Sequence, residues 1–265
     1  MKRISLLILF QSVFVLMLFA QNDLLKLAEN QFHNKNYEDA KKSYQLLTKQ
    51  FVNNEVAWFG LQNTYIKLGD LKTAQKAINI ELSDRLLWGQ IRILFYLKQF
   101  DTIPQMIFDL ARKYPKSEYI NDALDLGILL TSVKNDSNAL KKYSDALFQY
   151  EMDNYDKAIN IIKPLLIEPN IVAEYSYLLL AKLYVTKKEV NQAIATLNEF
   201  SVKFNKSRLL PKVKYEMGII YFEILQDTIK AKDIWEDLIS DFPESPQSFF
   251  ARSRLAVLGR GQQPK

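Results

Sequence analysis

Residues 54–77, NEVAWFGLQNTYIKLGDLKTAQKA, carry the clearest fold signal in the chain. It contains two amphipathic helical patterns separated by the loop Gly69-Asp70-Leu71. Gln62 on the first pattern and Ala74 on the second lie 12 residues apart, at the point where the two helices of a hairpin cross closely. The same spacing recurs in three further pairs, which are Ala28 with Ala40, Ala146 with Ala158, and Ala181 with Ala193. This recurrence predicts a repeat protein built from stacked helix hairpins.

The period of the repeat is visible in the step from Ala40 to Ala74, which is 34 residues. Tyr184 and Tyr221 fall at the same place in their units as Tyr65. The best-matched unit resembles the tetratricopeptide repeat, through Trp58, Leu61, Tyr65, Gly69 and Ala74. This resemblance implies an all-α fold, a right-handed superhelical solenoid of antiparallel helix hairpins with about fourteen helices.

The domain organisation follows from that period. We expect a signal peptide at 1–20, a repeat solenoid at 21–258 and a disordered tail at 259–265. The predicted repeat units lie near 21–54, 55–88, 84–117, 139–172, 174–207 and 211–244. An extra helix at 118–134 has no matching repeat partner, and a capping helix at 244–258 closes the solenoid.

The junctions between units share a pattern. Tyr114-Pro115-Lys116-Ser117 and Phe242-Pro243-Glu244-Ser245 are two copies, and Phe204-Asn205-Lys206-Ser207 is a degenerate third. The aromatic residue closes one helix, proline prevents its continuation, and serine caps the next helix. This junction is similar to that of exported bacterial tetratricopeptide proteins, such as the outer-membrane assembly lipoproteins and the periplasmic cell-division coordinator that works with the Tol system. The lipoprotein cysteine and an N-terminal coiled coil of those proteins are missing here.

The N-terminus reads as a secretory signal. Lys2 and Arg3 precede an apolar run from Ile4 to Ala20, with the expected cleavage after Ala20. An uncleaved membrane anchor is the alternative, because the run is near the lower limit for spanning a bilayer. The absence of cysteine excludes a lipid anchor on cysteine. We therefore expect an exported protein, periplasmic or outer-membrane-associated, with no membrane span once the leader is cleaved.

The composition argues against an enzyme. The chain has no cysteine, one histidine (His33) and only 7 glycines, so thiol catalysis, a two-histidine metal site and a phosphate-binding loop are all disfavoured. Its formal charge of +5 is spread among interspersed acidic and basic residues, which gives no stripe for nucleic acid. We predict no cofactor, no metal and no catalytic residue. An enzyme that uses tyrosines, arginines and carboxylates on the solenoid remains an alternative.

We predict a partner-binding groove on the concave face of the solenoid. It is formed by the residues that helical spacing places on one face of the first helix in each repeat unit. Aromatic residues make up 12% of the chain and are enriched at these positions. The predicted groove residues are Phe32, Phe59, Asn63, Arg85, Trp88, Arg92, Tyr143, Tyr150, Tyr175, Lys182 and Tyr215. Phe95 and Phe222 share this spacing but are expected to pack internally. In a tightly wound solenoid the other predicted groove rings would also be buried, between neighbouring repeats.

The function that these features predict is a non-enzymatic scaffold for protein–protein interaction in the bacterial cell envelope. An extended or helical segment of a partner would dock on the aromatic side chains, oriented by Arg85, Arg92 and Lys182. The alternative is a structural subunit of an outer-membrane biogenesis, secretion or motility complex, with peripheral association with the outer membrane.

Overall fold

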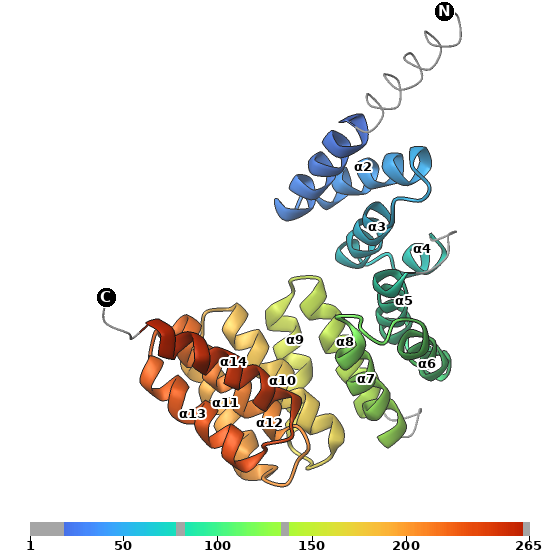
Figure 1. Ribbon diagram of the computed structural model, residues 1–265. Helices are drawn as coiled ribbons and strands as arrows, with labels where there is room; N and C mark the ends of the chain where they lie inside the picture. Colours follow the sequence, from blue (N-terminus) through green and yellow to red (C-terminus); the bar gives the residue numbers. More distant parts are fainter. Residues whose placement is uncertain (1–18, 78–82, 134–137, 262–265) are drawn as a thin grey trace, which may run out of the picture. The chain divides into compact units, whose positions relative to one another are not determined.

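The computed structural model describes residues 19–77, 83–133 and 138–261, and within these ranges every regular element is helical (Figure 1). The all-α prediction is confirmed, with 14 α-helices in the described part of the chain. The chain divides into two compact units. Unit 1 comprises Met1–Ser137 and Glu151–Asn154, and unit 2 comprises Asn138–Tyr150 and Tyr155–Lys265. Of the predicted leader at 1–20, residues 1–18 lie outside the described residues.

Unit 1 begins with a helix over residues 19–33. Its further helices are α2 (Tyr37–Gln50), α3 (Glu55–Leu68), α4 (Leu71–Lys76), α5 (Asp84–Tyr96), α6 (Ile103–Lys113) and α7 (Ile120–Ser132), with a 3-10 turn at Phe100–Thr102. Consecutive helices pack on each other, α2 on α3, α3 on α4 and α5, α5 on α6, and α6 on α7. The extra helix predicted at 118–134 corresponds to α7, which packs against the end of this series.

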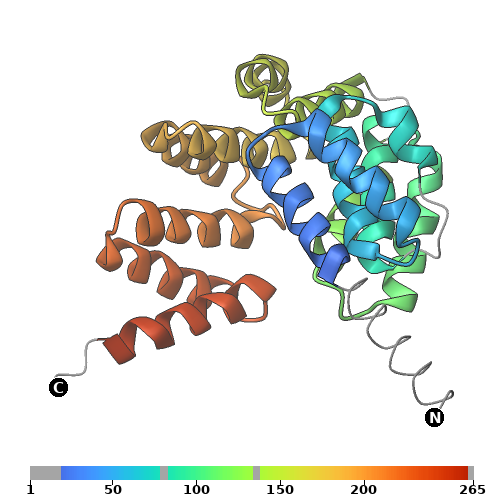
Figure 2. The ribbon, with the colours of Figure 1, turned by 90° about the horizontal axis from the view of Figure 1, so that it is seen from above.

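Unit 2 continues the pattern of helix hairpins. Its elements are α8 (Asn138–Glu151), α9 (Tyr155–Ile162), a 3-10 turn (Lys163–Leu166), α10 (Ile171–Thr186), α11 (Val190–Lys203), α12 (Leu210–Ile219), a π-helical turn (Ile220–Ile224), α13 (Thr228–Asp241) and α14 (Pro246–Gly261). From α9 to α14 each helix packs on the next, and Figure 2 shows α10 to α14 side by side in sequence order. The last residues of α8 and the turn after it, Glu151–Asn154, are grouped with unit 1.

Small residues lie at the crossings of the hairpin helices, as the spacing predicted. Ala28, Ala40 and Ala74 have no exposed surface, and Gln62, the larger residue among these pairs, is also fully buried. In unit 2 the same holds for Ala146, Ala158 and Ala193, and Ala181 is 4% exposed. A larger side chain at these crossings would push the helices apart, because protein interiors have little free volume.

The helix ends are set by local polar contacts. The side chain of Asn54 accepts a hydrogen bond from the Ala57 backbone N–H (2.9 Å) and so caps α3. Ser245 has the capping role predicted for the junctions, because its Oγ accepts from the N–H of Ser248 (3.2 Å) in the first turn of α14. At the other two junctions the serine does not cap the helix. Ser117 and Ser207 accept from the N–H groups of Tyr119 (3.2 Å) and Leu209 (3.0 Å), the residues directly before α7 and α12, and neither helix has a side-chain cap.

The turns within the hairpins repeat one backbone conformation. Gly69 has a φ of 78°, in the left-handed region that suits glycine. Five non-glycine residues in the described ranges have the same conformation, with φ between 56° and 63°, at Lys35, Lys98, Asp153, Lys188 and Gln226. Lysine at three of these five positions shows that the turn accepts a long side chain.

The C-terminal end differs from the prediction. We expected the last helix to end at residue 258 and a disordered tail to follow, but α14 continues to Gly261. No proline occurs between residues 247 and 263, so the backbone has no forced stop at Leu258. Residues 262–265 of the predicted tail lie outside the described residues. Among the helices that the structure describes, none has the length and apolar character to cross a membrane.

Candidate functional site

The first candidate surface is an aromatic cluster in unit 1, formed by Phe59 on α3, Trp88 on α5 and Tyr119 at the start of α7. The rings of Trp88 and Tyr119 stack at a centroid distance of 6.4 Å, and Phe59 lies 6.4 Å from Tyr119. The Arg85 guanidinium lies 5.8 Å from the centre of the Phe59 ring. All four side chains are partly exposed. We call Phe59, Arg85, Trp88 and Tyr119 the aromatic–cation cluster.

Tyr119 was not among the predicted groove residues. It lies in the junction after Tyr114-Pro115-Lys116-Ser117, where the hydrogen bond from its own N–H to Ser117 fixes its position. Burial and a hydrogen bond to Glu118 raise the pKa of Tyr119. No sequence signal marked this position, because Tyr119 lies two residues after Ser117 and the other two junctions have no aromatic residue there.

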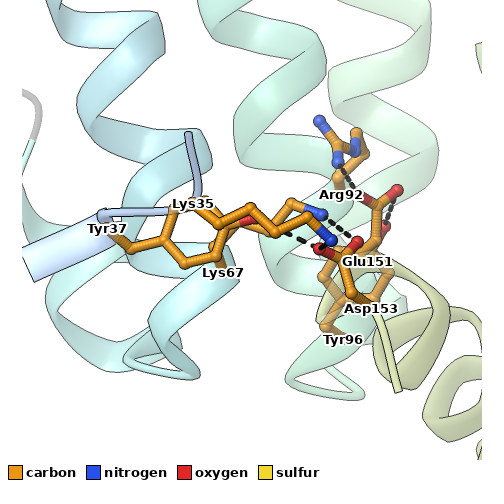
Figure 3. A network of polar contacts seen from close by, with 7 residues as sticks. All are labelled: Lys35, Tyr37, Lys67, Arg92, Tyr96, Glu151 and Asp153. Carbon is orange, nitrogen blue, oxygen red and sulfur yellow. Dashed lines mark hydrogen bonds and ion pairs between the residues drawn. The ribbon is translucent and has the colours of Figure 1, made fainter. Parts of the chain in front are cut away.

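Asn63 and Arg92, also predicted groove residues, contact each other. Asn63 Oδ1 accepts a hydrogen bond from Arg92 Nη1 (3.1 Å). The Arg92 Nη2 atom lies 2.8 Å from Glu151 Oε2, and the Tyr96 hydroxyl donates to Glu151 Oε1 (3.3 Å) (Figure 3). Burial and the Glu151 carboxylate raise the pKa of Tyr96, so this hydroxyl keeps its proton.

A second carboxylate of the same turn is bound beside the first. Asp153 Oδ1 lies 2.7 Å from the Lys67 ammonium group, and its Oδ2 lies 3.0 Å from that of Lys35. The Tyr37 hydroxyl donates to the same Oδ2 (3.1 Å). Figure 3 shows both ammonium groups pointing at Asp153 while the Arg92 guanidinium faces Glu151. We call Lys35, Lys67 and Arg92 the cation cluster, and Glu151–Asn154 the acidic turn.

The network is shielded from solvent to different degrees. The side chains of Arg92, Lys67, Asp153 and Glu151 are 17%, 18%, 21% and 23% exposed, whereas Lys35 is 65% exposed. Of the seven residues in Figure 3, only Arg92 was predicted as a site residue. Sequence spacing could not reveal the others, because the contacts join residues that are 55 to 118 positions apart.

Phe32 lies on the helix over 19–33 and is partly exposed. Its ring packs edge-on against Tyr37 (5.4 Å) and against His33 (6.2 Å). His33 is the last residue of that helix and is exposed. Phe32 therefore contacts the network of Figure 3, because Tyr37 is part of that network. It is not part of the aromatic–cation cluster.

In unit 2 the predicted tyrosines divide into buried and exposed rings. Tyr143 and Tyr175 are 8% and 7% exposed and pack edge to face at 6.3 Å. The Tyr175 hydroxyl accepts a hydrogen bond from Arg208 Nη2, and that guanidinium lies 5.8 Å from the ring centre. Tyr150 is partly exposed, with the Lys182 ammonium 4.7 Å above its ring. Tyr150 and Lys182 therefore offer more surface to a partner than the buried pair does.

Tyr215 belongs to a packing cluster around Trp235, which has no exposed surface. Its ring lies 6.3 Å from Trp235 and 6.1 Å from Phe250, and its backbone carbonyl accepts a hydrogen bond from the indole (3.4 Å). Phe222 contacts the same indole at 5.7 Å, in agreement with its expected internal packing. Phe95 is 1% exposed, as expected for a core residue.

The described residues contain no group of three or more histidine, cysteine, aspartate or glutamate side chains that could hold a metal ion. What the geometry offers instead is partly exposed aromatic rings with cations beside them, and a cluster of cations that binds carboxylates. Both arrangements recognise polypeptide segments, through ring contacts and charge-assisted hydrogen bonds.

Comparison with known proteins supports the repeat assignment. The model of the tetratricopeptide repeat family matches residues 24–54 and 213–245, which correspond to the predicted units 21–54 and 211–244. No curated protein matches the chain. Solved structures with a similar fold include a tetratricopeptide repeat protein from Parabacteroides merdae, with 15% identity, a TM-score of 0.38, and coverage of 83% of this chain and 92% of the other.

A second similar structure is the C-terminal part of a tetratricopeptide repeat-containing protein from Cytophaga hutchinsonii, with 16% identity, a TM-score of 0.35, and coverage of 86% of this chain and 98% of the other. A third is the tetratricopeptide domain of P58(IPK), with 14% identity, a TM-score of 0.37, and coverage of 91% and 65%. The family match therefore supports the predicted tetratricopeptide character at two units, 24–54 and 213–245, whereas the unit that contains Trp58, Tyr65 and Gly69 lies outside the matched residues.

Proposed function

We propose that this protein is a non-enzymatic, exported scaffold that binds a segment of a partner protein in the bacterial cell envelope. The observation that carries the proposal is the aromatic–cation cluster of unit 1. Its partly exposed rings of Phe59, Trp88 and Tyr119, with Arg85 beside them, match the side chains that dominate protein-binding surfaces. Stacked helical repeats present such residues on extended surfaces for binding.

The proposed binding is tested by removing the rings. Phe59→Ala combined with Trp88→Ala should lose most of the partner that the wild-type protein captures from cross-linked envelopes of the host. Phe108→Ala is the matched control, because this ring is 60% exposed on α6 and is not part of the cluster. Retention of the same partner by the double variant, with its helical circular dichroism unchanged, would overturn the proposal. Equal loss with Phe108→Ala would also overturn it.

The exported location rests on the leader pattern of residues 1–20 and on the aromatic-Pro-x-Ser junctions. The complete lack of cysteine is compatible with this location. Fractionation of host cells followed by N-terminal sequencing tests it directly. We expect a chain that begins at Gln21 in the periplasmic or outer-membrane fraction. A chain that keeps Met1 in the cytoplasmic fraction would contradict the proposal.

A structural subunit of an outer-membrane biogenesis, secretion or motility complex is the second candidate. The apolar surface of the last helix favours it, because Phe249 and Val257 on α14 are 64% and 65% exposed. A subunit held by that surface would co-purify with its complex at a fixed ratio, and Phe249→Ala with Val257→Ser would reduce the yield. Loss of the partner on mutation of the aromatic–cation cluster alone would favour the adaptor role.

A further inference from the structure

The acidic turn has the geometry of a bound ligand within unit 1. Each of its four carboxylate oxygens has its own donor: Glu151 Oε1 from Tyr96, Glu151 Oε2 from Arg92, Asp153 Oδ1 from Lys67, and Asp153 Oδ2 from Lys35 and Tyr37. A contact between two carboxylates and three cations that satisfies every oxygen is specific in both charge and position.

The donors come from three successive hairpins of unit 1. Lys35 and Tyr37 belong to the turn and helix after residues 19–33, Lys67 ends α3, and Arg92 and Tyr96 lie on α5. The bound segment is short, because Glu151 and Asp153 are separated by one residue. Stacked repeats form a continuous surface, so several repeats can each supply one or two side chains to one bound segment.

We propose that the cation cluster recognises an acidic segment of a partner protein, of the form acid-x-acid, and that the acidic turn occupies this site as an internal ligand until the partner replaces it. This inference rests on the proposed scaffold function and specifies the chemistry of its partner. The chain's own turn defines what the site accepts, and the cation cluster has one more positive charge than the turn has carboxylates.

Two further features favour exchange. Lys35 is 65% exposed although it is paired with Asp153, so an incoming carboxylate can reach it before the turn leaves. An open hollow of about 350 Å³ lies beside this contact and gives room for an incoming segment. Its lining is Lys35, Asn36, Tyr37, Glu38, Asp39 and Leu68, and the two carboxylates among them pair with Lys41 and Lys42. An internal ligand competes at a high effective concentration, so it lowers the apparent affinity for a free segment in proportion to its occupancy.

The test measures binding of a fluorescein-labelled peptide with the sequence of residues 148–155, FQYEMDNY, to the full chain by fluorescence anisotropy. Glu151→Gln with Asp153→Asn removes the charges of the internal ligand, and we expect this variant to bind the peptide at least tenfold more tightly than the wild type. Adding Lys67→Met and Arg92→Gln should abolish that gain. Asp156→Asn with Asp241→Asn is the matched control, because it removes two carboxylates that pair with Lys187 and Lys214 elsewhere.

A second variant keeps the test decisive if the first one folds poorly. Asp153→Lys suits the left-handed turn, because Lys35, Lys98 and Lys188 have the same backbone conformation. It should also bind the peptide more tightly than the wild type, because like charge drives the turn away from Lys67.

Three results would overturn the proposal. Unchanged affinity in both variants would show that the turn does not compete. Failure of both variants to fold would show that the turn is only structural. Equal binding of the uncharged peptide FQYQMNNY, or of single-stranded DNA, would show that the site does not select an acidic segment. None of these results affects the binding proposed for the aromatic–cation cluster, whose test uses other residues.

Discussion

The ammonium group of Lys67 lies 2.7 Å from Oδ1 of Asp153, a residue 86 positions further along the chain. This contact, with those of Lys35, Arg92, Tyr37 and Tyr96, joins the ends of three hairpins of unit 1 to one acidic turn. Its strength should depend on how far each partner is shielded from water, because ion pairs weaken with exposure.

The two lysines around Asp153 should therefore differ in their contribution to stability. Lys67→Met should lower the free energy of unfolding by about 1–3 kcal/mol, because a mostly buried carboxylate loses a shielded cation. Lys35→Met should cost less than about 1 kcal/mol, since Lys35 is largely exposed. Urea denaturation at low and moderate salt measures both values. Equal losses for the two variants would mean that shielding does not set the strength of this network.

Gly218 should not tolerate a methyl group. A Cβ at this position would lie 2.1 Å from Trp235 Nε1 and 2.6 Å from two further atoms of the indole, which is fully buried. Gly218→Ala should therefore destabilise the protein by about 1–3 kcal/mol through overpacking. Gly127→Ala is the control, because its Cβ would meet only Ile107 at 3.4 Å, and the change should be neutral or slightly stabilising. A neutral Gly218→Ala in thermal unfolding would contradict the packing around Trp235.

Tyr44 should make stability fall at alkaline pH. Burial, with a smaller contribution from Glu29, raises the pKa of Tyr44 from 10.0 to about 12. The folded state therefore keeps this proton while the unfolded state loses it, so stability is intact below pH 10 and decreases between pH 10 and 12. The contribution is about 1.4 kcal/mol per pH unit in that window. Tyr44→Phe should show a shallower decrease in urea titrations at pH 9 to 12, and an identical pH profile would contradict the assignment.

Two predicted groove tyrosines should respond differently to truncation. Tyr175→Ala should cost about 3 kcal/mol, because this ring is 7% exposed and packs against Tyr143. Tyr150→Ala should cost about 1 kcal/mol, because its ring is partly exposed beside Lys182. Chemical denaturation distinguishes them. A larger loss for Tyr150 would show that it is a core residue, which leaves no binding role for its ring.

Local sequence pattern was sufficient to predict the helices and their crossings. The 12-residue spacing of Ala28 with Ala40 and of Ala146 with Ala158 predicted buried crossings, because both members of each pair lie in one hairpin. Among the junction serines, the cap at Ser245 was equally predictable, since it acts on a backbone N–H three residues away. Such signals depend only on neighbouring residues.

The candidate site was less predictable, because its geometry depends on how separate hairpins stack. Arg92 was predicted to orient a partner, but its guanidinium contacts Glu151 of the same chain. The residues around Glu151 and Asp153 do not indicate that these carboxylates are bound, because the groups that donate to them lie far away in the sequence, in the first three hairpins. Likewise helical spacing placed Tyr143 and Tyr150 on one face, but it does not say how neighbouring helices cover each ring.

Site-specific photo-cross-linking from the aromatic–cation cluster tests the central claim, that this surface binds a partner protein. p-Benzoylphenylalanine replaces Tyr119 in one strain and Val202, which is 80% exposed on α11, in the control strain. After irradiation of intact host cells, we expect an adduct with one envelope protein from position 119 and none with that protein from position 202. No adduct from position 119, or the same adducts from both positions, would contradict it.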